Sequence, residues 1–541
     1  MQIGGLEERP DNIALGPPDT GTERSLALPL LDVAGRIFAA LIDPRRQNHA
    51  VLGVLAVYVL VWTLYAVVAK SSQDIHPDTG ELLTWSNELA LGYWKHPPLG
   101  VYVVKLWTMI FPVADWSFYL LGTINAALAL WLAWRLSASL MSEEKRVMGL
   151  ALLTLVPFFN FLALDYNHNT LLLPLWAMTA LFFLRSFKTR QLGYAALAGL
   201  AAGLAMLGKY WSIMLIVGLV LAALSDARRR EYFCSAAPWI TVLVGGAVLA
   251  PHCAWLLQNH FVSLDYASGI HAGRSAVAVA VSALAFLLAG ALYVSIPLAI
   301  VAFALRPSKI VVVDSIFPST VDRRFIALMF WAPLLLPIPI AIAAQSRLIS
   351  TWAIPAMTLL PVVLLGSPLL TLKTETSIKI VALAIVFPFL ALLVAPLVAL
   401  NVYLHPNATG SSYYRLLSIE VQRIWRDQTD RPIRRVVGDR AAAVGTAFYS
   451  GDHPVVNPHD TASGDSMRRF SPLNLETQDV RRQGVVAVCM GNVSECAWLR
   501  HILPSADRLQ EVTLARRFLG WSGKPAVFSI IALPPIPVSG D

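Results

Sequence analysis

Two long runs of apolar residues constrain this chain more than any other feature. One begins at Ile326 and reads IALMFWAPLLLPIPIAIAA, and the other begins at Ile380 and reads IVALAIVFPFLALLVAPLVAL. In a helix, about 18 or more apolar residues match the hydrocarbon thickness of a bilayer. Only helices and closed barrels satisfy their backbone polar groups there, and these runs lack the alternation of barrel strands. The sequence therefore predicts a helical protein that crosses a membrane.

The low share of charged residues fits the same solvent. Charged residues make up 14% of the 541 residues, hydrophobic residues make up 56%, and the mean hydropathy is +0.60. A soluble globular chain has about a quarter of its residues charged. The formal net charge is +8, but the Lys and Arg residues lie in short loops between apolar runs. This pattern indicates membrane topology, and we expect no nucleic-acid partner.

The apolar runs predict about eleven transmembrane helices. They begin near Ala50, Trp116, Val147, Leu171, Leu192, Trp211, Ala236, Val277, Ile326, Trp352 and Ile380. Residues 1–47 read as a polar arm without a cleavable signal peptide. Lys and Arg gather in that arm and in alternate loops, so the positive-inside rule predicts a cytoplasmic N-terminus. Residues 48–402 then form the membrane domain, with a first outer loop at 71–115, and the odd number of spans places residues 403–541 outside.

The tail after residue 402 changes character. Three short apolar segments, RRVVGD, VVAVCMG and AVFSIIALP, alternate with polar stretches and predict the strands of a small α/β domain. Cys489 and Cys496 both lie in this tail, and they form either a disulfide in an oxidising compartment or two free thiols. The predicted fold class is an all-α polytopic membrane protein with a small extracytoplasmic α/β domain at its C-terminus.

The first outer loop carries carboxylates and aromatic residues beside the membrane. Asp74, Asp78 and Glu81 follow the first span directly. A carboxylate in such a place can take a proton from an attacking hydroxyl, and the alternative is simple solvation in a loop. The stretch after Pro98 is too short to cross the membrane and is amphipathic, which suits a helix in the interface.

The same loop contains the sequence Lys95-His96-Pro97-Pro98. Paired prolines stiffen the chain, so they present Lys95 and His96 at a fixed place beside the membrane. The alternative is a plain turn that leads into the interfacial helix. The two side chains are therefore candidates for substrate binding.

A tight outer loop before the fourth predicted span reads DYNHN from Asp165. Its side chains reach the same face of the membrane as the first loop. Asp165, His168 and Asn169 are therefore further candidates for substrate binding. For Asn169, capping of the next helix is an equally good explanation.

Three cations lie in outer loops, where the charge bias opposes Lys and Arg. They are Lys209 in LAMLGKYWSIM, Arg274 in SGIHAGRSA and Arg347 in AAQSRLIST. Charge near membrane depth is costly and is usually functional, and a Lys there is suited to an anionic lipid head group. The alternative for Lys209 is snorkelling to the interface.

Three residues of the outer loops, His260, Asp265 and His271, are of types that ligate divalent metals. Their spacing matches no standard metal motif. A divalent metal held by His260 and His271 remains an open alternative, and the sequence predicts no other cofactor.

These outer-loop motifs resemble the polyprenyl-phosphate-dependent glycosyltransferases of the GT-C fold, which include protein O-mannosyltransferases and the lipid A aminoarabinose transferase. The likeness is to the bacterial branch known as glycosyltransferase families 39 and 83, and it extends over about residues 50 to 365. The first-loop motif of that branch appears here as Asp78, Trp85-Ser86, Leu89-Ala90-Leu91-Gly92-Tyr93 and Lys95-His96-Pro97-Pro98-Leu99. Later motifs appear as Leu204 to Tyr210 and as Pro251, Trp255 and Asn259.

The resemblance implies a donor phosphate bound by Lys209 with Arg274 or Arg347, and a substrate contact by Tyr93. It also implies Asp78 as the catalytic carboxylate. The family often has Asp-Glu where this chain has Asp78-Thr79, so Asp74 or Glu81 is the alternative base. The family also has Asp-Thr where this chain has Asn169-Thr170; Asn169 cannot act as a base, and Asp165 or His168 would compensate.

The sequence thus predicts an inverting transferase in the bacterial inner membrane, with its C-terminal domain in the periplasm. Its donor is a polyprenyl-phosphate sugar, and its acceptor is lipid A, lipopolysaccharide, another envelope glycan or a protein. A flippase for lipid-linked sugars is the main alternative, but the chain has no clear internal repeat and its polar groups gather at one face. An inactive glycan-binding scaffold of the same fold is the third hypothesis.

Overall fold

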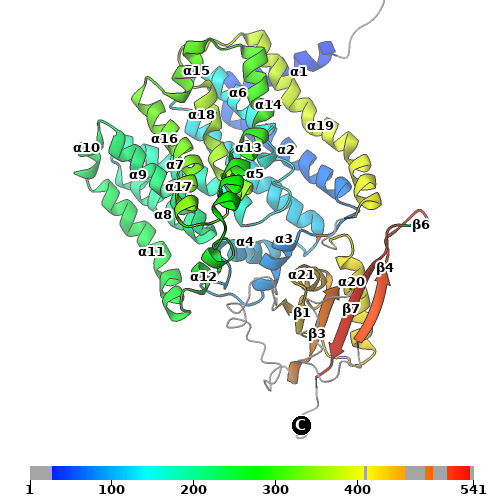
Figure 1. Ribbon diagram of the computed structural model, residues 1–541. Helices are drawn as coiled ribbons and strands as arrows, with labels where there is room; N and C mark the ends of the chain where they lie inside the picture. Colours follow the sequence, from blue (N-terminus) through cyan, green and yellow to red (C-terminus); the bar gives the residue numbers. More distant parts are fainter. Residues whose placement is uncertain (1–26, 407–410, 457–481, 492–508, 536–541) are drawn as a thin grey trace, which may run out of the picture.

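Helices long enough to cross a membrane dominate the computed structural model, which describes residues 27–406, 411–456, 482–491 and 509–535 (Figure 1). Within these residues seven helical segments have the length and apolar composition of a membrane span. They are α2 (Gln47–Ala69), α5 (Asp115–Ser137), α7 (His168–Thr189), α11 (Ala237–Gln258), α13 (Ala276–Tyr293), α16 with α17 (Val321–Leu335 and Pro337–Ala343) and α19 (Thr374–Leu404). Each corresponds to a predicted span, so the chain is a multi-pass membrane protein.

Four other predicted spans are shorter than a full membrane crossing. They are α6 (Glu143–Thr154), α8 (Leu192–Gly208), η2 with α9 (Tyr210–Ser212 and Ile213–Ser225) and η4 with α18 (Ser350–Leu359 and Leu360–Leu365). Pro157 follows α6 closely and prevents the helix from continuing. Gly199 and Gly203 of α8 let this helix pack closely on α11, where a Cβ atom at Gly199 would lie 2.3 Å from the Thr241 carbonyl oxygen.

Three more short apolar helices and four connecting ones complete the membrane region. The apolar ones are α4 (Leu99–Thr108), α14 (Ser295–Ile300) and η3 (Val301–Leu305). The connecting ones are α3 (Pro77–Trp85), α10 (Arg229–Phe233), α12 (Val262–Gly269) and α15 (Lys309–Ile316). A single turn, η1, lies at Pro157–Phe159. Helix α4 confirms the predicted short helix after Pro98, which is its N-cap residue.

The N-terminal arm is more ordered than its polar composition predicts. Residues Ala27–Ile42 form helix α1, which contacts α2, α6 and α19. Ala34, Phe38 and Leu41 are buried at helical spacing, so one face of α1 packs on the membrane helices. Residues 27–42 of the predicted polar arm therefore form a helix with one apolar face.

The C-terminal tail forms the predicted α/β domain. Its sheet has the order β2-β1-β3-β7-β4, with β1 (Arg435–Gly438) parallel to β2 (Val455–Val456) and β3 (Val485–Met490). Strand β7 (Ala526–Leu533) is antiparallel to β3 and to β4 (Leu509–Leu514), and β5 (Arg517–Phe518) and β6 (Trp521–Ser522) form a small hairpin.

Two helices, α20 (Tyr414–Arg426) and α21 (Arg440–Tyr449), pack on this sheet. The three predicted strand segments correspond to β1, β3 and β7. Cys489 of β3 is disulfide-bonded, whereas Cys496 lies outside the described residues.

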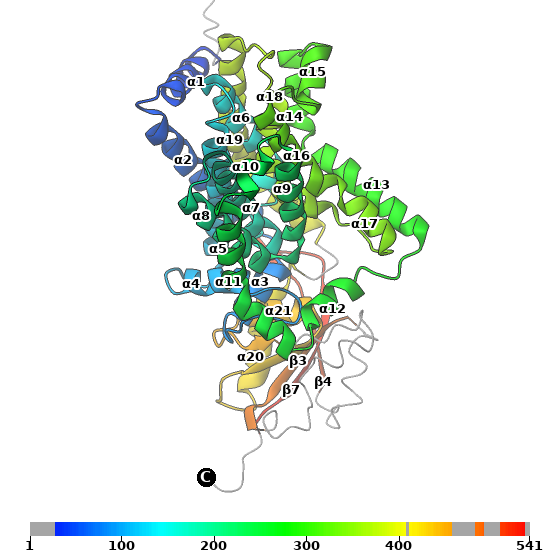
Figure 2. The same cartoon turned by 90° about the vertical axis from the view of Figure 1, so that its left-hand side faces the viewer.

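The C-terminal domain lies at one end of the helical bundle, and α1 and α15 lie at the other end (Figures 1 and 2). Helices α3, α4 and α12 lie where the bundle meets the domain (Figure 2). On one side of α3, the Thr79 hydroxyl donates to the Tyr166 carbonyl oxygen at 2.8 Å. On the other side, a Cβ atom at Gly80 would lie 2.6 Å from Val444 of α21. Helix α3 is thus held between the two parts of the protein.

Candidate active site

A polar cavity of about 550 Å³ lies beside α3. Its walls come from α3, the loop before α4, the start of α7, the junction of α8 and η2, α12 and the start of η4. Its polar lining includes Asp78, Glu81, Lys95, His96, Asn167, His168, Asn169, Lys209, Tyr210, Tyr266, His271, Ser346 and Thr351. The structure therefore brings together eight of the residues that the sequence singled out, from four separate segments.

The two carboxylates of α3 have different surroundings. The Glu81 side chain is 3% exposed, and its oxygens lie 2.8 Å from Lys95 Nζ and 3.1 Å from Arg440 Nη1. The Asp78 side chain is 36% exposed, and the same two cations lie farther away, at 3.8 Å and 3.5 Å. Because Glu81 is fully engaged by cations, Asp78 is the carboxylate that can meet a molecule in the cavity.

Charge around Asp78 keeps it ionised. Burial alone would raise the pKa of Asp78, but the positive charges of Lys95, His76 and Arg440 hold this pKa well below its usual range. Burial would likewise lower the pKa of Lys95, but Glu81 and Asp78 raise it. In the cavity as it stands, Asp78 is therefore an anion and Lys95 a cation at neutral pH.

Lys209 faces the carboxylates from the junction between α8 and η2, where the backbone is extended. Its Nζ donates to the amide oxygen of Asn169 at 2.5 Å and lies 5.4 Å from the centre of the Trp352 ring. Burial lowers the pKa of Lys209 to about 8, with Asp78 opposing the shift and Lys95 adding to it. Among the described residues its hydrogen-bond partner is a neutral amide, so its charge is available to an anionic ligand.

Asn169 is therefore a hydrogen-bond acceptor for Lys209 and does not cap α7. The cap is Asn167, whose side chain accepts from the backbone N–H groups of Asn169 and Thr170 at 2.8 and 3.2 Å. The Thr170 hydroxyl accepts from the Asn167 backbone N–H in return, which completes a capping box. The capping alternative for Asn169 was wrong by two residues.

Two histidine rings lie in contact in the lining of the cavity. The centres of the His96 and His168 rings are 4.0 Å apart. Nδ1 of His168 lies 2.9 Å from the Gly208 carbonyl oxygen, which can only accept, so Nδ1 carries the proton. Nε2 of His168 then has a free lone pair, and it has no hydrogen-bond partner among the described residues. Burial and the neighbouring charges lower the pKa of His96 well below its usual range.

The structure places Asp74 outside the cavity. Its carboxylate pairs with Arg516 and accepts from the backbone N–H of Arg415 at 3.1 Å, and its own N–H donates to the Ser411 carbonyl oxygen. Asp74 therefore joins the first loop to the C-terminal domain. It is not placed to meet a substrate as the alternative base.

Two other predicted substrate contacts also do not line the cavity. Tyr93 is buried against Trp85, with ring centres 5.1 Å apart, and its hydroxyl donates to the Glu88 carbonyl oxygen. Asp165 forms an ion pair with Lys70 at the end of α2. Both residues stabilise loops that surround the site.

The predicted phosphate ligands Arg274 and Arg347 do not line the cavity, although the nearby His271 and Ser346 do. The Arg347 backbone N–H donates to the His271 carbonyl oxygen, and both arginine side chains are exposed. Burial and the charges of Lys209, Arg347 and Arg274 lower the pKa of His271 to about 4. His260 is exposed at the turn before α12 and does not line the cavity. Within the described residues no three His, Cys, Asp or Glu side chains are grouped as metal ligands.

Sequence reasoning missed Arg440. This residue begins α21 of the C-terminal domain, 359 positions from Glu81 in the chain, yet their side chains touch. No local pattern links them. The Asp439 N-cap signal predicts a helix at this point but not the surface that the helix meets.

Three comparisons place the chain among known proteins. Residues 95–255 match the family model described as dolichyl-phosphate-mannose-protein mannosyltransferase. Among curated proteins of Rhizobium johnstonii, the lipopolysaccharide core galacturonosyltransferase RgtB is 28% identical over 59% of this chain and 65% of its own length. The lipid A galacturonosyltransferase RgtD is 28% identical over 39% of this chain and 45% of its own length. The matches thus span about half to two thirds of these relatives.

A solved structure extends the comparison to the whole fold. The chain superposes on ArnT from Cupriavidus metallidurans in the apo state with a TM-score of 0.61, over 89% of this chain and 98% of that one, at 13% identity. The undecaprenyl-phosphate-bound structure of the same protein gives a TM-score of 0.60. The sequence matches agree with the resemblance of the outer-loop motifs, and the chain has the GT-C fold of ArnT.

Proposed function

We propose that this protein is an inverting glycosyltransferase of the bacterial inner membrane, which moves a sugar from a polyprenyl-phosphate donor to an envelope glycolipid. The proposal rests on one observation. A single cavity contains both the ionised carboxylate of Asp78 and the cation of Lys209, which is available to a ligand. Inverting transfer needs a carboxylate near the acceptor hydroxyl and positive charge for the departing phosphate. The names of the relatives make lipid A or lipopolysaccharide the acceptor to test first, and a galacturonosyl group the sugar.

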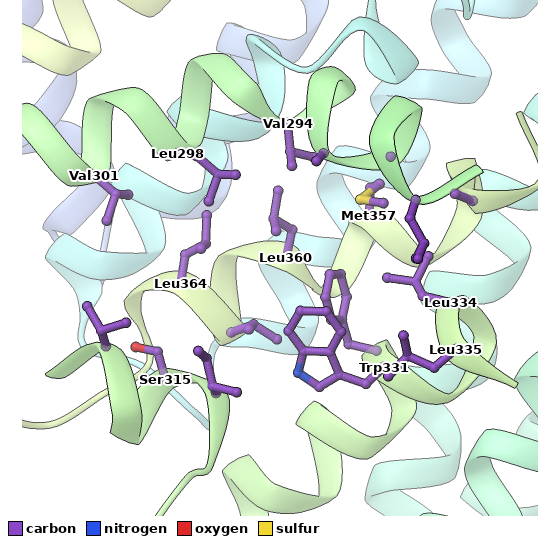
Figure 3. A pocket seen from close by; sticks show the side chains of 18 of the residues that line it. Val294, Leu298, Val301, Ser315, Trp331, Leu334, Leu335, Met357, Leu360 and Leu364 are labelled. Carbon is purple, nitrogen blue, oxygen red and sulfur yellow. The ribbon is translucent and has the colours of Figure 1, made fainter. Parts of the chain in front are cut away.

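A second cavity supports a donor with a lipid tail. It measures about 520 Å³, and the side chains that line it are apolar apart from Ser315 and the indole of Trp331 (Figure 3). Helix η4 joins the two cavities, because Trp352 lines the polar one and Ala353 and Met357 line the apolar one. At about 2 Å of rise per residue, Trp352 and Met357 are about 10 Å apart along the helix. A phosphate in the polar cavity and an isoprenoid chain in the apolar one are therefore close enough for one molecule.

Donor binding also prepares Asp78 to accept a proton. Among the positive charges that lower the pKa of Asp78, that of Lys95 has the largest effect. When a donor phosphate pairs with Lys95 and Lys209, its negative charge offsets theirs, and the pKa of Asp78 rises toward the range of a useful base.

The proposed topology follows the predicted one. The N-terminus lies in the cytoplasm, and the cavity and the C-terminal domain lie on the periplasmic side, so that residues 1–47, 48–402 and 403–541 form the arm, the membrane domain and the outer domain. The opposite placement of α1 and the C-terminal domain along the bundle supports this arrangement (Figure 1).

The function is tested with purified protein, a polyprenyl-phosphate sugar and lipid A in vesicles, with mass spectrometry of the lipids. We expect lipid A to gain one sugar mass with the wild type. Lipid A from a deletion strain should lose the same mass and regain it on complementation. Movement of the labelled donor across the vesicle membrane without any new glycolipid would favour the flippase alternative.

The wild-type enzyme is expected to lose donor affinity at alkaline pH. Lys209 is charged below its pKa of about 8 and neutral above it, so kcat/KM for the donor should fall as pH rises from about 7 to about 9. Lys209→Arg keeps its charge throughout this range, and its profile should stay flat there. A wild-type profile identical to that of Lys209→Arg would contradict the role of Lys209.

Filling the apolar cavity should weaken binding of long-chain donors. Gly290 lines this cavity and has open space around its Cβ position, so Gly290→Trp has room for the start of a side chain there. We expect KM to rise about tenfold for a long-chain donor, since the ring occupies part of the space of the tail, and to change little for a short-chain analogue. Gly246→Trp is the control, because Gly246 also has open space but lines neither cavity. Equal effects on both donors would exclude this cavity as the tail site.

A further inference from the structure

The C-terminal domain contributes one charged side chain to the carboxylates of the cavity. Arg440, the first residue of α21, is 29% exposed and places Nη1 at 3.1 Å from Glu81 and 3.5 Å from Asp78. The negative charges of Glu81 and Asp78 raise the pKa of Arg440 above its ordinary value. Among the described residues, the other charged groups that face these two carboxylates come from the membrane domain.

The backbone that carries Arg440 is fixed by its own domain. Asp439 accepts from the backbone N–H of Ala442 at 2.9 Å and so caps α21, and its own N–H donates to the Val488 carbonyl oxygen of β3. Gly438 precedes this cap with φ +115°, and a Cβ atom there would lie 2.0 Å from the same carbonyl oxygen. Only glycine fits such a close approach in this conformation. The backbone from which the Arg440 side chain extends is therefore held rigidly at the end of β1.

Helix α21 is also fixed against the membrane domain. Besides the contact of Val444 with Gly80, the Tyr449 hydroxyl donates to Asp115 at 2.6 Å and accepts from the Ile75 backbone N–H at 2.8 Å. These contacts thus fix the position from which the Arg440 side chain reaches Glu81.

We propose that Arg440 is a positioning residue that neutralises Glu81 and so frees Lys95 for the donor phosphate. The inference rests on the proposed function and assigns the C-terminal domain a part in the active site. Lys95 and Arg440 contact different oxygens of Glu81, Oε2 and Oε1. When Lys95 turns toward a phosphate, Arg440 still balances the charge of the buried Glu81. Without Arg440, release of Lys95 would leave a buried carboxylate without a partner, which is costly.

The test compares Arg440→Gln, Arg440→Lys and Arg423→Gln in the full-length enzyme, with a polyprenyl-phosphate sugar as the probe. Arg423 is the control, because it lies in the same domain and pairs only with Glu420 and Asp427 among the described residues. We expect Arg440→Gln to raise KM for the donor about 10- to 100-fold, with little change in kcat or in melting temperature. Arg440→Lys should fall between Arg440→Gln and the wild type, and Arg423→Gln should match the wild type.

A double variant separates positioning from direct contact with the donor. If Arg440 acts through Glu81, then Glu81→Gln removes the charge that Arg440 must balance, and Arg440→Gln should then cost less than twofold more. If the losses caused by Glu81→Gln and by Arg440→Gln multiplied in the double variant, the inference would be overturned. An Arg440→Gln enzyme with an unchanged KM for the donor would overturn it as well. Should Arg440→Gln alone fail to fold, the double variant decides against Glu81→Gln: a further loss of more than twofold overturns the inference. Absence of transfer by the wild type would instead contradict the proposed function.

Discussion

Asp78→Asn should lower kcat for sugar transfer by about 10²- to 10⁴-fold, the range expected when a general base is removed. Asn keeps the size and hydrogen-bonding shape of Asp but cannot take a proton. The ion pairs of the Asp78 carboxylate, at 3.5 Å to Arg440 and 3.8 Å to Lys95, are longer than those of Glu81. Loss of the Asp78 carboxylate should therefore leave the melting temperature within a few degrees of the wild type. The measurement is single-turnover transfer with saturating donor.

Two matched variants give this result its meaning. Glu88→Gln removes a carboxylate from the same loop that is exposed and does not line the cavity, and it should leave kcat unchanged. Glu81→Gln breaks two ion pairs of a buried carboxylate and should lower the melting temperature as well as activity. If Glu81→Gln abolished transfer in a fully stable protein while Asp78→Asn remained active, the base would be Glu81.

Lys95→Gln is expected to produce the second large loss, about 10²- to 10³-fold in kcat/KM. Lys95 is 11% exposed and balances both carboxylates of α3, and in the proposed mechanism it also meets the donor phosphate. Removal of Lys95 takes away the cation with the largest lowering effect on the pKa of Asp78, so this pKa should rise. The acid limb of the profile of kcat/KM against pH should then move to higher pH.

Lys95→Arg is the control for charge. It keeps the cation but changes its shape and reach, so the acid limb should stay near that of the wild type while KM rises. An acid limb that is identical in Lys95→Gln and the wild type would mean that Asp78 does not set it.

Sequence reasoning succeeded where one segment decides its own structure. The seven long spans follow from local hydropathy, because the thickness of a bilayer fixes the length of an apolar helix. It failed for α6, where neighbouring helices bury ten of the 12 residues, so that length is no guide. It also failed for α1, where the buried face is a narrow stripe of three residues in a polar arm.

The same division explains the site. The loop motifs around Asp78, Lys95 and Lys209 predicted residues that do meet in one cavity, because each motif adjoins the end of an apolar segment on the same predicted side. Asp74 and Asp78 follow the same span, and only the distant arginines Arg415 and Arg516 distinguish them. Side-chain partners that come from the far end of the chain leave no local pattern, so they cannot be predicted from spacing.

The close contact of Gly80 with Val444 has a consequence for exchanging parts between related enzymes. Because there is no room for even a methyl group between α3 and α21, a foreign C-terminal domain with a bulkier surface would push the catalytic loop out of place. The loop and the domain therefore have to be transplanted together, although 359 positions separate Arg440 from Glu81. The loop and the domain form one module that can be exchanged as a unit, and the membrane helices between them support it.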